Sequence, residues 1–124
     1  MNLDNIVNTL INYLKRIYEK TDFLIYVYLS KGFVYCDYQI LSTKKVENKE
    51  AKLEKKQLFS KYSFNIFEEY FNSDQIKSEV IEIKIVYLNN PEKKDYKVYN
   101  DIGEEIFAAE LFNNWIEEYT KLNT

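Results

Sequence analysis

The chain of 124 residues has no histidine and only two glycines, Gly32 and Gly103. Histidine is the side chain that ordinarily titrates near neutral pH, so Ser-His-Asp catalysis, Cys-His catalysis and His-ligated metal sites are excluded. Two distant glycines cannot form a G-x-G-x-x-G turn or a P-loop. We therefore expect no catalytic residue, no cofactor and no metal.

Cysteine is equally scarce, because Cys36 is the only one. It cannot form an internal disulfide, which fits a reducing compartment. Its position among aromatic residues predicts a buried, inert thiol rather than a nucleophile. The sequence has no basic segment followed by an apolar run at its start, and no apolar run approaches the ~18 residues of a membrane span. These features predict a soluble cytoplasmic protein without a signal peptide or a membrane partner.

Aromatic residues are abundant: 12 tyrosines, 8 phenylalanines and one tryptophan. Tyrosine is a rigid, amphipathic side chain that is common in protein interfaces. The net charge of -3 disfavours general binding to nucleic acid or to an anionic membrane. The composition therefore favours one globular domain over residues 1–124 that binds another protein, as a monomer or a weak dimer.

The first part of the chain predicts a helix and a hairpin. Apolar residues recur at helical spacing over residues 3–20, and Asn2 is a candidate N-cap. Residues 23–29 and 33–40 alternate with a period of two and are rich in β-branched and aromatic residues. The intervening Ser30–Gly32 predicts a tight turn.

The second part predicts a helix, a hairpin and a last helix. Residues 43–57 are dominated by lysine and glutamate and read as an exposed connection, or as one with some strand or helix late in it. A short helix is predicted over 61–72, capped by Ser60 or Ser63. Strands are predicted at 79–88 and 95–99, on either side of an Asn-Asn-Pro turn. Asp101 and Glu104 have capping-box spacing before an apolar stripe that contains Trp115.

This order predicts an α+β fold: an antiparallel sheet of about four strands in two hairpins, with N-terminal, middle and C-terminal helices packed on one face. We expect a single core shared by both hairpins and the last helix. Its predicted members are Phe23, Ile25, Val27, Ile81, Ile83, Ile85, Leu111, Phe112, Trp115 and Ile116.

Acidic residues concentrate in the last segment, where six acids and one lysine give -5 over residues 101–124. A solvated helix face with acids favoured by the helix dipole explains part of this charge. The other interpretation is an acidic docking surface for a basic partner. The candidate partner-binding residues are Glu104, Glu105, Glu110, Glu117 and Glu118, together with the hairpin tyrosines Tyr26, Tyr28, Tyr35 and Tyr38.

Two other patterns have alternative interpretations. The hairpin tyrosines are either buried sheet residues or interface residues, and the nearby Asp37 disfavours base stacking. Residues 44–61 hold seven lysines and three glutamates. That segment is either an exposed, solubilising loop or a phosphate-binding strip, although the latter would ordinarily contain arginine.

The chain resembles the YezG-like family of bacterial immunity proteins in its N-terminal helix and aromatic hairpin (residues 25–28 and 33–38), its strand over 80–90, and its acidic tail with Trp115 and Tyr119. The resemblance implies a small cytoplasmic α+β antitoxin that binds a secreted toxin domain, such as a nuclease, and blocks it by occlusion. The alternative is a phage- or plasmid-encoded inhibitor or adaptor that acts on a host defence nuclease complex. An enzyme is the third and least favoured class.

Overall fold

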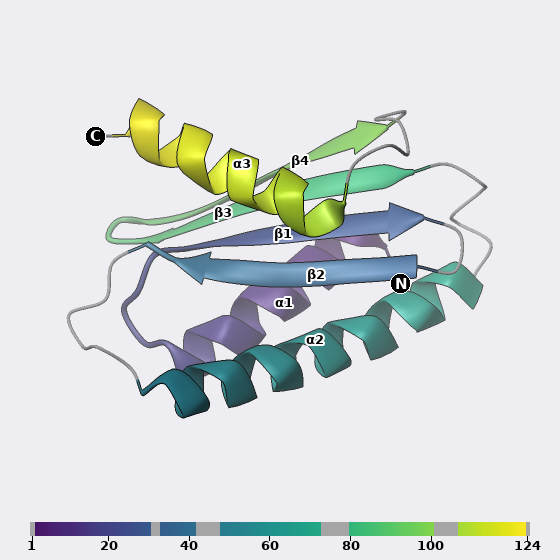
Figure 1. The fold of residues 1–124 in the computed structure, drawn as a ribbon, viewed down its shortest axis with the longest axis horizontal. Coiled ribbons are helices and arrows are strands. Elements are labelled where there is room, and N and C mark those ends of the chain that lie inside the picture. Colours follow the sequence, from purple (N-terminus) through teal and green to yellow (C-terminus); the bar gives the residue numbers. More distant parts are fainter. Residues whose placement is uncertain (1, 31–32, 42–47, 73–79, 101–106, 124) are drawn as a thin grey trace.

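The computed structural model describes residues 2–30, 33–41, 48–72, 80–100 and 107–123. The elements follow the predicted order of helix, hairpin, helix, hairpin and helix (Figure 1). They are α1 (Leu3–Ile17), β1 (Phe23–Ser30), β2 (Phe33–Ile40), α2 (Lys49–Asn72), β3 (Ile81–Asn89), β4 (Glu92–Asn100) and α3 (Ala108–Leu122).

The four strands form one antiparallel sheet in the order β2-β1-β3-β4. Each predicted hairpin is present, and the two hairpins join through β1 and β3, where Ile25 lies opposite Ile85. The α+β class and the four-stranded antiparallel sheet are therefore confirmed. The Ser30–Gly32 turn falls partly outside the described residues.

Helix α1 begins at the predicted cap, because the Asn2 side chain accepts a hydrogen bond from the Asn5 amide at 2.9 Å. It buries Ile6, Leu10 and Leu14 along one stripe against the sheet. The spacing of these residues by four places them on one side of the helix, so their burial explains why this segment is helical.

The start predicted for the middle helix, α2, was wrong. The helix begins at Lys49, well before residue 61, and the side chain of Asn48 accepts a hydrogen bond from the Glu50 amide at 2.8 Å. Its inner side includes the aliphatic part of Lys56, whose ammonium group donates to Asp37 at 2.8 Å and also to the carbonyl oxygen of Tyr38. A lysine can thus serve on the inner side of a helix while its charge finds partners at the rim.

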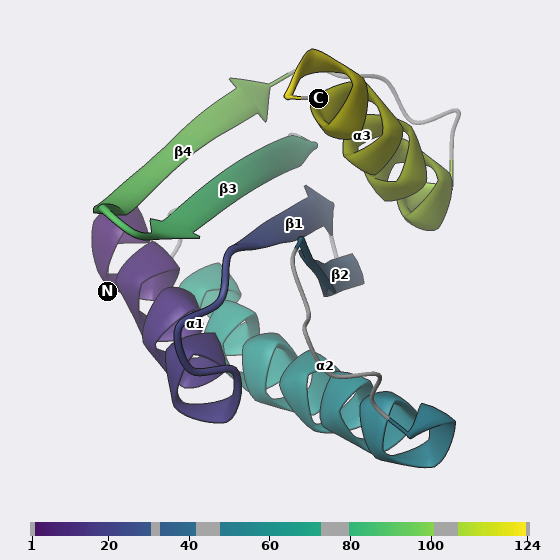
Figure 2. The ribbon, with the colours of Figure 1, turned by 90° about the vertical axis from the view of Figure 1, so that its left-hand side faces the viewer.

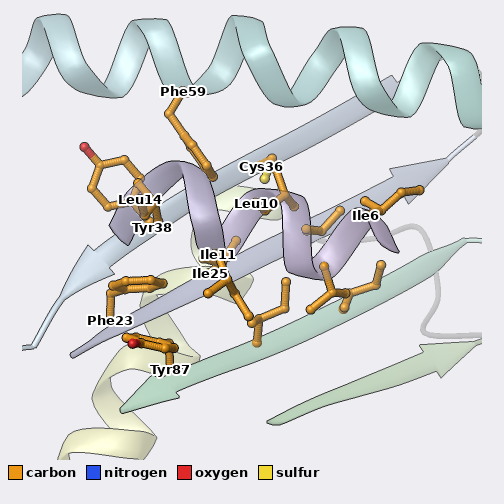
Figure 3. Close-up of a cluster of buried hydrophobic side chains, with 14 of the residues drawn as sticks. Ile6, Leu10, Ile11, Leu14, Phe23, Ile25, Cys36, Tyr38, Phe59 and Tyr87 are labelled. Atoms are coloured by element: carbon orange, nitrogen blue, oxygen red, sulfur yellow. The ribbon is translucent and has the colours of Figure 1, made fainter. Parts of the chain in front are cut away.

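The helices cover both faces of the sheet, not one (Figure 2). Helices α1 and α2 lie against the face that carries Ile25 and Ile83, and Figure 3 shows this cluster around Phe23, Tyr38, Phe59 and Tyr87. Helix α3 covers the opposite face, where Phe112 and Trp115 pack with Leu24 and Tyr26. The predicted single core is therefore corrected to two.

Strand β1 explains why two layers of helices are needed. From Phe23 to Leu29 every residue is buried, including those on both sides of the pleat. A strand that is apolar on both faces must be covered on both faces, as in sheets that lie between two layers of helices. The apolar stripe of the last helix is thus satisfied by residues 24, 26 and 28, and the odd-numbered residues belong to the other core.

Candidate interaction surface

Helix α3 is fixed to the sheet by an aromatic cluster centred on Tyr26. The rings of Tyr26 and Phe112 are stacked with centroids 5.5 Å apart, and Trp115 lies 6.2 Å from the same tyrosine ring. Tyr26 is fully buried and Trp115 nearly so. The burial of three large rings sets the position of α3, and therefore the direction in which its outer residues face.

A polar cluster is buried under the same helix. The Tyr26 hydroxyl donates a hydrogen bond to Oε2 of Glu82, and Nζ of Lys84 lies 3.8 Å from Oε1 of that carboxylate. Lys84 also lies over the rings of Tyr99 and Trp115, at 4.9 and 5.8 Å from their centroids. A buried carboxylate requires such partners, so this cluster stabilises the sheet beneath α3 and connects it to Trp115.

Three side chains of the first hairpin have raised pKa values. Burial and the hydrogen bond to Glu82 raise the pKa of Tyr26 far above its ordinary value. Burial, with the nearby Asp37 carboxylate, raises the pKa of Tyr35 to about 12. Cys36 is buried, as the sequence predicted, and burial raises its pKa to about 12. At neutral pH these groups are therefore protonated, and Cys36 is a poor nucleophile.

The acidic candidates of α3 that the structure describes all face solvent. Glu110, Glu117 and Glu118 are exposed, whereas Phe112 and Trp115 of the same helix point into the second core. Helix α3 begins at Ala108 with Phe107 as its N-cap, and the Phe107 side chain makes no capping hydrogen bond. Asp101, Glu104 and Glu105 lie outside the described residues, and so does the capping box predicted from the first two.

The four hairpin tyrosines do not form one surface. Tyr26, Tyr28 and Tyr35 belong to the side of the sheet that α3 covers, whereas Tyr38 belongs to the core under α1 and α2. Tyr26 and Tyr38 are 0% and 1% exposed, so neither can contact a partner of this fold. Tyr28 is also buried, and only Tyr35 is partly accessible. For Tyr26, Tyr28 and Tyr38 the interpretation as buried sheet residues is correct.

Sequence reasoning missed the exposure of Phe33 and Phe107 and the burial of Glu82. Phe33, at the start of β2, is 49% exposed and lies edge-on to Tyr28 at 6.1 Å. Phe107, at the start of α3, is 83% exposed. Glu82, in the second hairpin's first strand, β3, is only 6% exposed. The available signal for Glu82 was its place on the same face of β3 as Val86, beneath an apolar helix.

The lysine-rich segment also has a different structure from the predicted loop. Its residues from Lys49 onward form the first turns of α2, and Lys44 and Lys45 lie outside the described residues. Within that part of the chain, Lys49, Lys52 and Lys61 are exposed, whereas Lys55 and Lys56 are partly buried and lie over the rings of Tyr18 and Tyr38. The segment is therefore a helix with lysines on more than one side, not a continuous strip.

Two absences among the described residues complete the description of the surface. Across these residues, no group of three histidine, cysteine, aspartate or glutamate side chains is arranged to hold a metal ion. None of the helices described is both long and apolar enough to cross a membrane. Comparison with protein-family models, with curated proteins and with solved structures gives no significant match for this chain.

Proposed function

We propose that this protein is a cytoplasmic immunity protein or inhibitor of the YezG-like kind, which binds a basic toxin domain, such as a nuclease, and blocks it by occlusion. The observation that carries the proposal is the division of α3 into two sides. Phe112 and Trp115 hold the helix on the sheet, and Glu110, Glu117 and Glu118 stand on its exposed side. The acidic side contributes nothing visible to the core, so it is available for a partner.

A basic partner suits this surface for an electrostatic reason. A nuclease must carry positive charge where it grips phosphate, and an acidic helix complements that charge. Complementary charge raises the association rate and disfavours acidic competitors. Within α3, three glutamates are opposed only by Lys121, so the helix keeps a net negative charge. The half-exposed ring of Phe33 contacts Tyr28 on the face of the sheet that α3 covers, and the exposed Phe107 precedes the first residue of α3, so both rings are accessible for apolar contact.

The test is a charge reversal on α3 with a matched control on α2. Glu117→Lys with Glu118→Lys should weaken the complex with the co-expressed product of the neighbouring gene and make it less sensitive to salt. Lys52→Glu with Lys61→Glu changes the charge by the same magnitude at two exposed positions of α2 and should not weaken the complex. Lys55 and Lys56 are unsuitable controls, because both contact tyrosine rings of the core.

The measurement is the dissociation constant, with circular dichroism to verify that both double variants fold. Weaker binding by the α2 variant and unchanged binding by the α3 variant would place the interface on the opposite side and refute the proposal. Failure of the neighbouring gene product to bind, combined with recovery of a defence nuclease complex, would favour the alternative class of phage- or plasmid-encoded inhibitor.

A further inference from the structure

Strand β4 is an edge of the sheet and is open to solvent along its length. It pairs with β3 on one side, and Figure 2 shows it as the outermost strand, away from β2. Eight of its nine residues are exposed and Tyr96 is intermediate. Among the described residues no other strand pairs with its outer edge. An open edge presents unpaired backbone N–H and C=O groups that can bind another strand.

The charges of β4 include one that its own sheet leaves uncompensated. Lys97 lies directly opposite Lys84 of β3, and like charges opposed across strands are destabilising. No acidic side chain of the described ranges forms an ion pair with Lys97. Asp95, two positions away on the same face, lies opposite Val86 and likewise has no ion-pair partner there. Lys93, opposite Leu88, has no ion-pair partner among these residues either, so the strand carries exposed, unpaired charges of both signs.

We propose that β4 pairs in antiparallel register with β4 of a second copy of this chain, centred on Tyr96, so that one sheet continues through both copies. A two-fold axis perpendicular to the sheet exchanges opposed residues, so each contact occurs twice. In this register Asp95 faces Lys97 of the second copy and Lys97 faces its Asp95. The other opposed pairs are Glu92 with Asn100, Lys93 with Tyr99 and Lys94 with Val98.

Charge selects this register over its neighbours. In an antiparallel pair, the side chains of directly opposed residues lie on the same face of the sheet. In a symmetric pair of β4 strands, every allowed register therefore places one residue directly opposite the same residue of the second copy. Centring on Lys94, Asp95 or Lys97 would place that charged residue against itself. Centring on Val98 would pair only residues 96–100 and form no ion pair. The Tyr96 register uses all of β4 and opposes no like charges.

The lysines of β4 fit the same register. Exposed lysines on an edge strand ordinarily discourage pairing with other chains. Here Lys93 meets an aromatic ring, Lys94 meets an aliphatic side chain and Lys97 meets a carboxylate. The same lysines oppose one another in most shifted registers, so they disfavour indiscriminate edge pairing and leave one specific dimer. This surface lies on β4 and does not use the exposed glutamates of α3.

The experiment is a charge swap followed by sedimentation velocity across the micromolar to near-millimolar range. In a dimer of Asp95→Lys chains, or of Lys97→Asp chains, residues 95 and 97 carry the same charge and face each other twice. Each variant alone should therefore dimerise at least about tenfold more weakly than wild type. In a dimer of one Asp95→Lys chain with one Lys97→Asp chain, both opposed pairs again combine a positive with a negative side chain. A mixture of the two variants should therefore dimerise about as strongly as wild type.

Glu118→Lys changes the net charge by the same amount as Asp95→Lys, but on α3, and should leave dimerisation unchanged. Asp95 and Lys97 are both exposed, so the variants should fold, and circular dichroism checks this. The proposal is overturned by a wild-type chain that is monomeric at every concentration. It is equally overturned by an Asp95→Lys variant that dimerises like wild type, or by a mixture that does not recover the dimer.

Discussion

The hydrogen bond between Tyr26 and the buried Glu82 gives the sharpest test of how the second core is held. Tyr26→Phe removes one hydroxyl group and preserves the ring that stacks on Phe112. The described residues supply no other hydrogen-bond donor to the Glu82 carboxylate, because Lys84 stands at 3.8 Å. The substitution therefore leaves a carboxylate that is 6% exposed with only a longer-range ion pair.

The expected loss of unfolding free energy is about 2–3 kcal/mol, the typical cost of removing a buried hydrogen bond to a charged group. Tyr96→Phe is the matched control, because the Tyr96 hydroxyl makes the same kind of bond to Asp4 at an exposed position. A phenol and a carboxylate in contact with solvent should contribute less than about 1 kcal/mol, since water replaces the lost partner.

The measurement is equilibrium denaturation followed by circular dichroism and by tryptophan fluorescence. Trp115 is the only tryptophan and lies 6.2 Å from Tyr26, so its fluorescence reports on the packing of α3. Glu82→Gln in the Tyr26→Phe background completes a double-mutant cycle, whose coupling energy should be at least about 1 kcal/mol. If Tyr26→Phe cost no more than Tyr96→Phe, the Glu82 carboxylate would not depend on this bond and the reasoning would be refuted.

Two further predictions concern packing and pH. Trp115→Ala should lower the unfolding free energy by about 3–5 kcal/mol, because it removes a large buried ring between α3 and the sheet. Denaturation monitored by circular dichroism checks this, and an unchanged midpoint would show that α3 does not pack as described. Burial raises the pKa of Cys36 from 9.0 to about 12, so its contribution to stability is complete below pH 9.0 and declines as the pH rises towards 12. Above pH 9.0, the unfolding free energy of Cys36→Ser should therefore fall less steeply with pH than that of wild type, by up to about 1.4 kcal/mol per pH unit. The measurement is denaturation of both proteins at a series of pH values, and an equal fall of the unfolding free energy in the two would contradict this.

The sequence predicted the elements of the fold better than their arrangement. The period-2 pattern of residues 23–29 and 81–87 predicted β1 and β3, because alternation is a local property of the chain. The helix that covers the even-numbered residues of β1 is α3, which is so distant in sequence that a local pattern does not identify it. Leu24, Tyr26 and Tyr28 were signals of two-sided burial, since a strand with one solvated face would carry polar residues there.

The start of α2 was harder to predict for a related reason. Lysine and glutamate are good helix formers, but a run of them also resembles an exposed loop. Lys56 belongs to the inner side of the helix only because Asp37 and the Tyr38 carbonyl, distant in sequence, accept hydrogen bonds from its ammonium group. Phe59, fully buried, continues that side three residues later, which is the helical spacing that the sequence did contain.

The candidate surface was predicted in part. The positions of Glu110, Glu117 and Glu118 on the solvent side of the last helix follow from the spacing of Phe112 and Trp115, so helical periodicity was sufficient. Tyrosine excess was not sufficient, because a tyrosine ring is accommodated equally well in a core and in an interface. Tyr26 and Tyr38 are in cores, and their hydroxyls find partners in Glu82 and Tyr18.

The two-sided character of α3 has a consequence for how such a protein can diverge. The residues that hold the helix, Ala108, Phe112 and Trp115, are separate from the exposed glutamates. Substitutions at exposed positions without structural contacts ordinarily change stability by less than about 0.5 kcal/mol. If the exposed glutamates bind the partner as proposed, descendants of this chain can exchange outer residues of α3, and with them the preferred partner, while the same three anchors keep the helix in place. Selection for new specificity and selection for folding then act on different side chains of one helix.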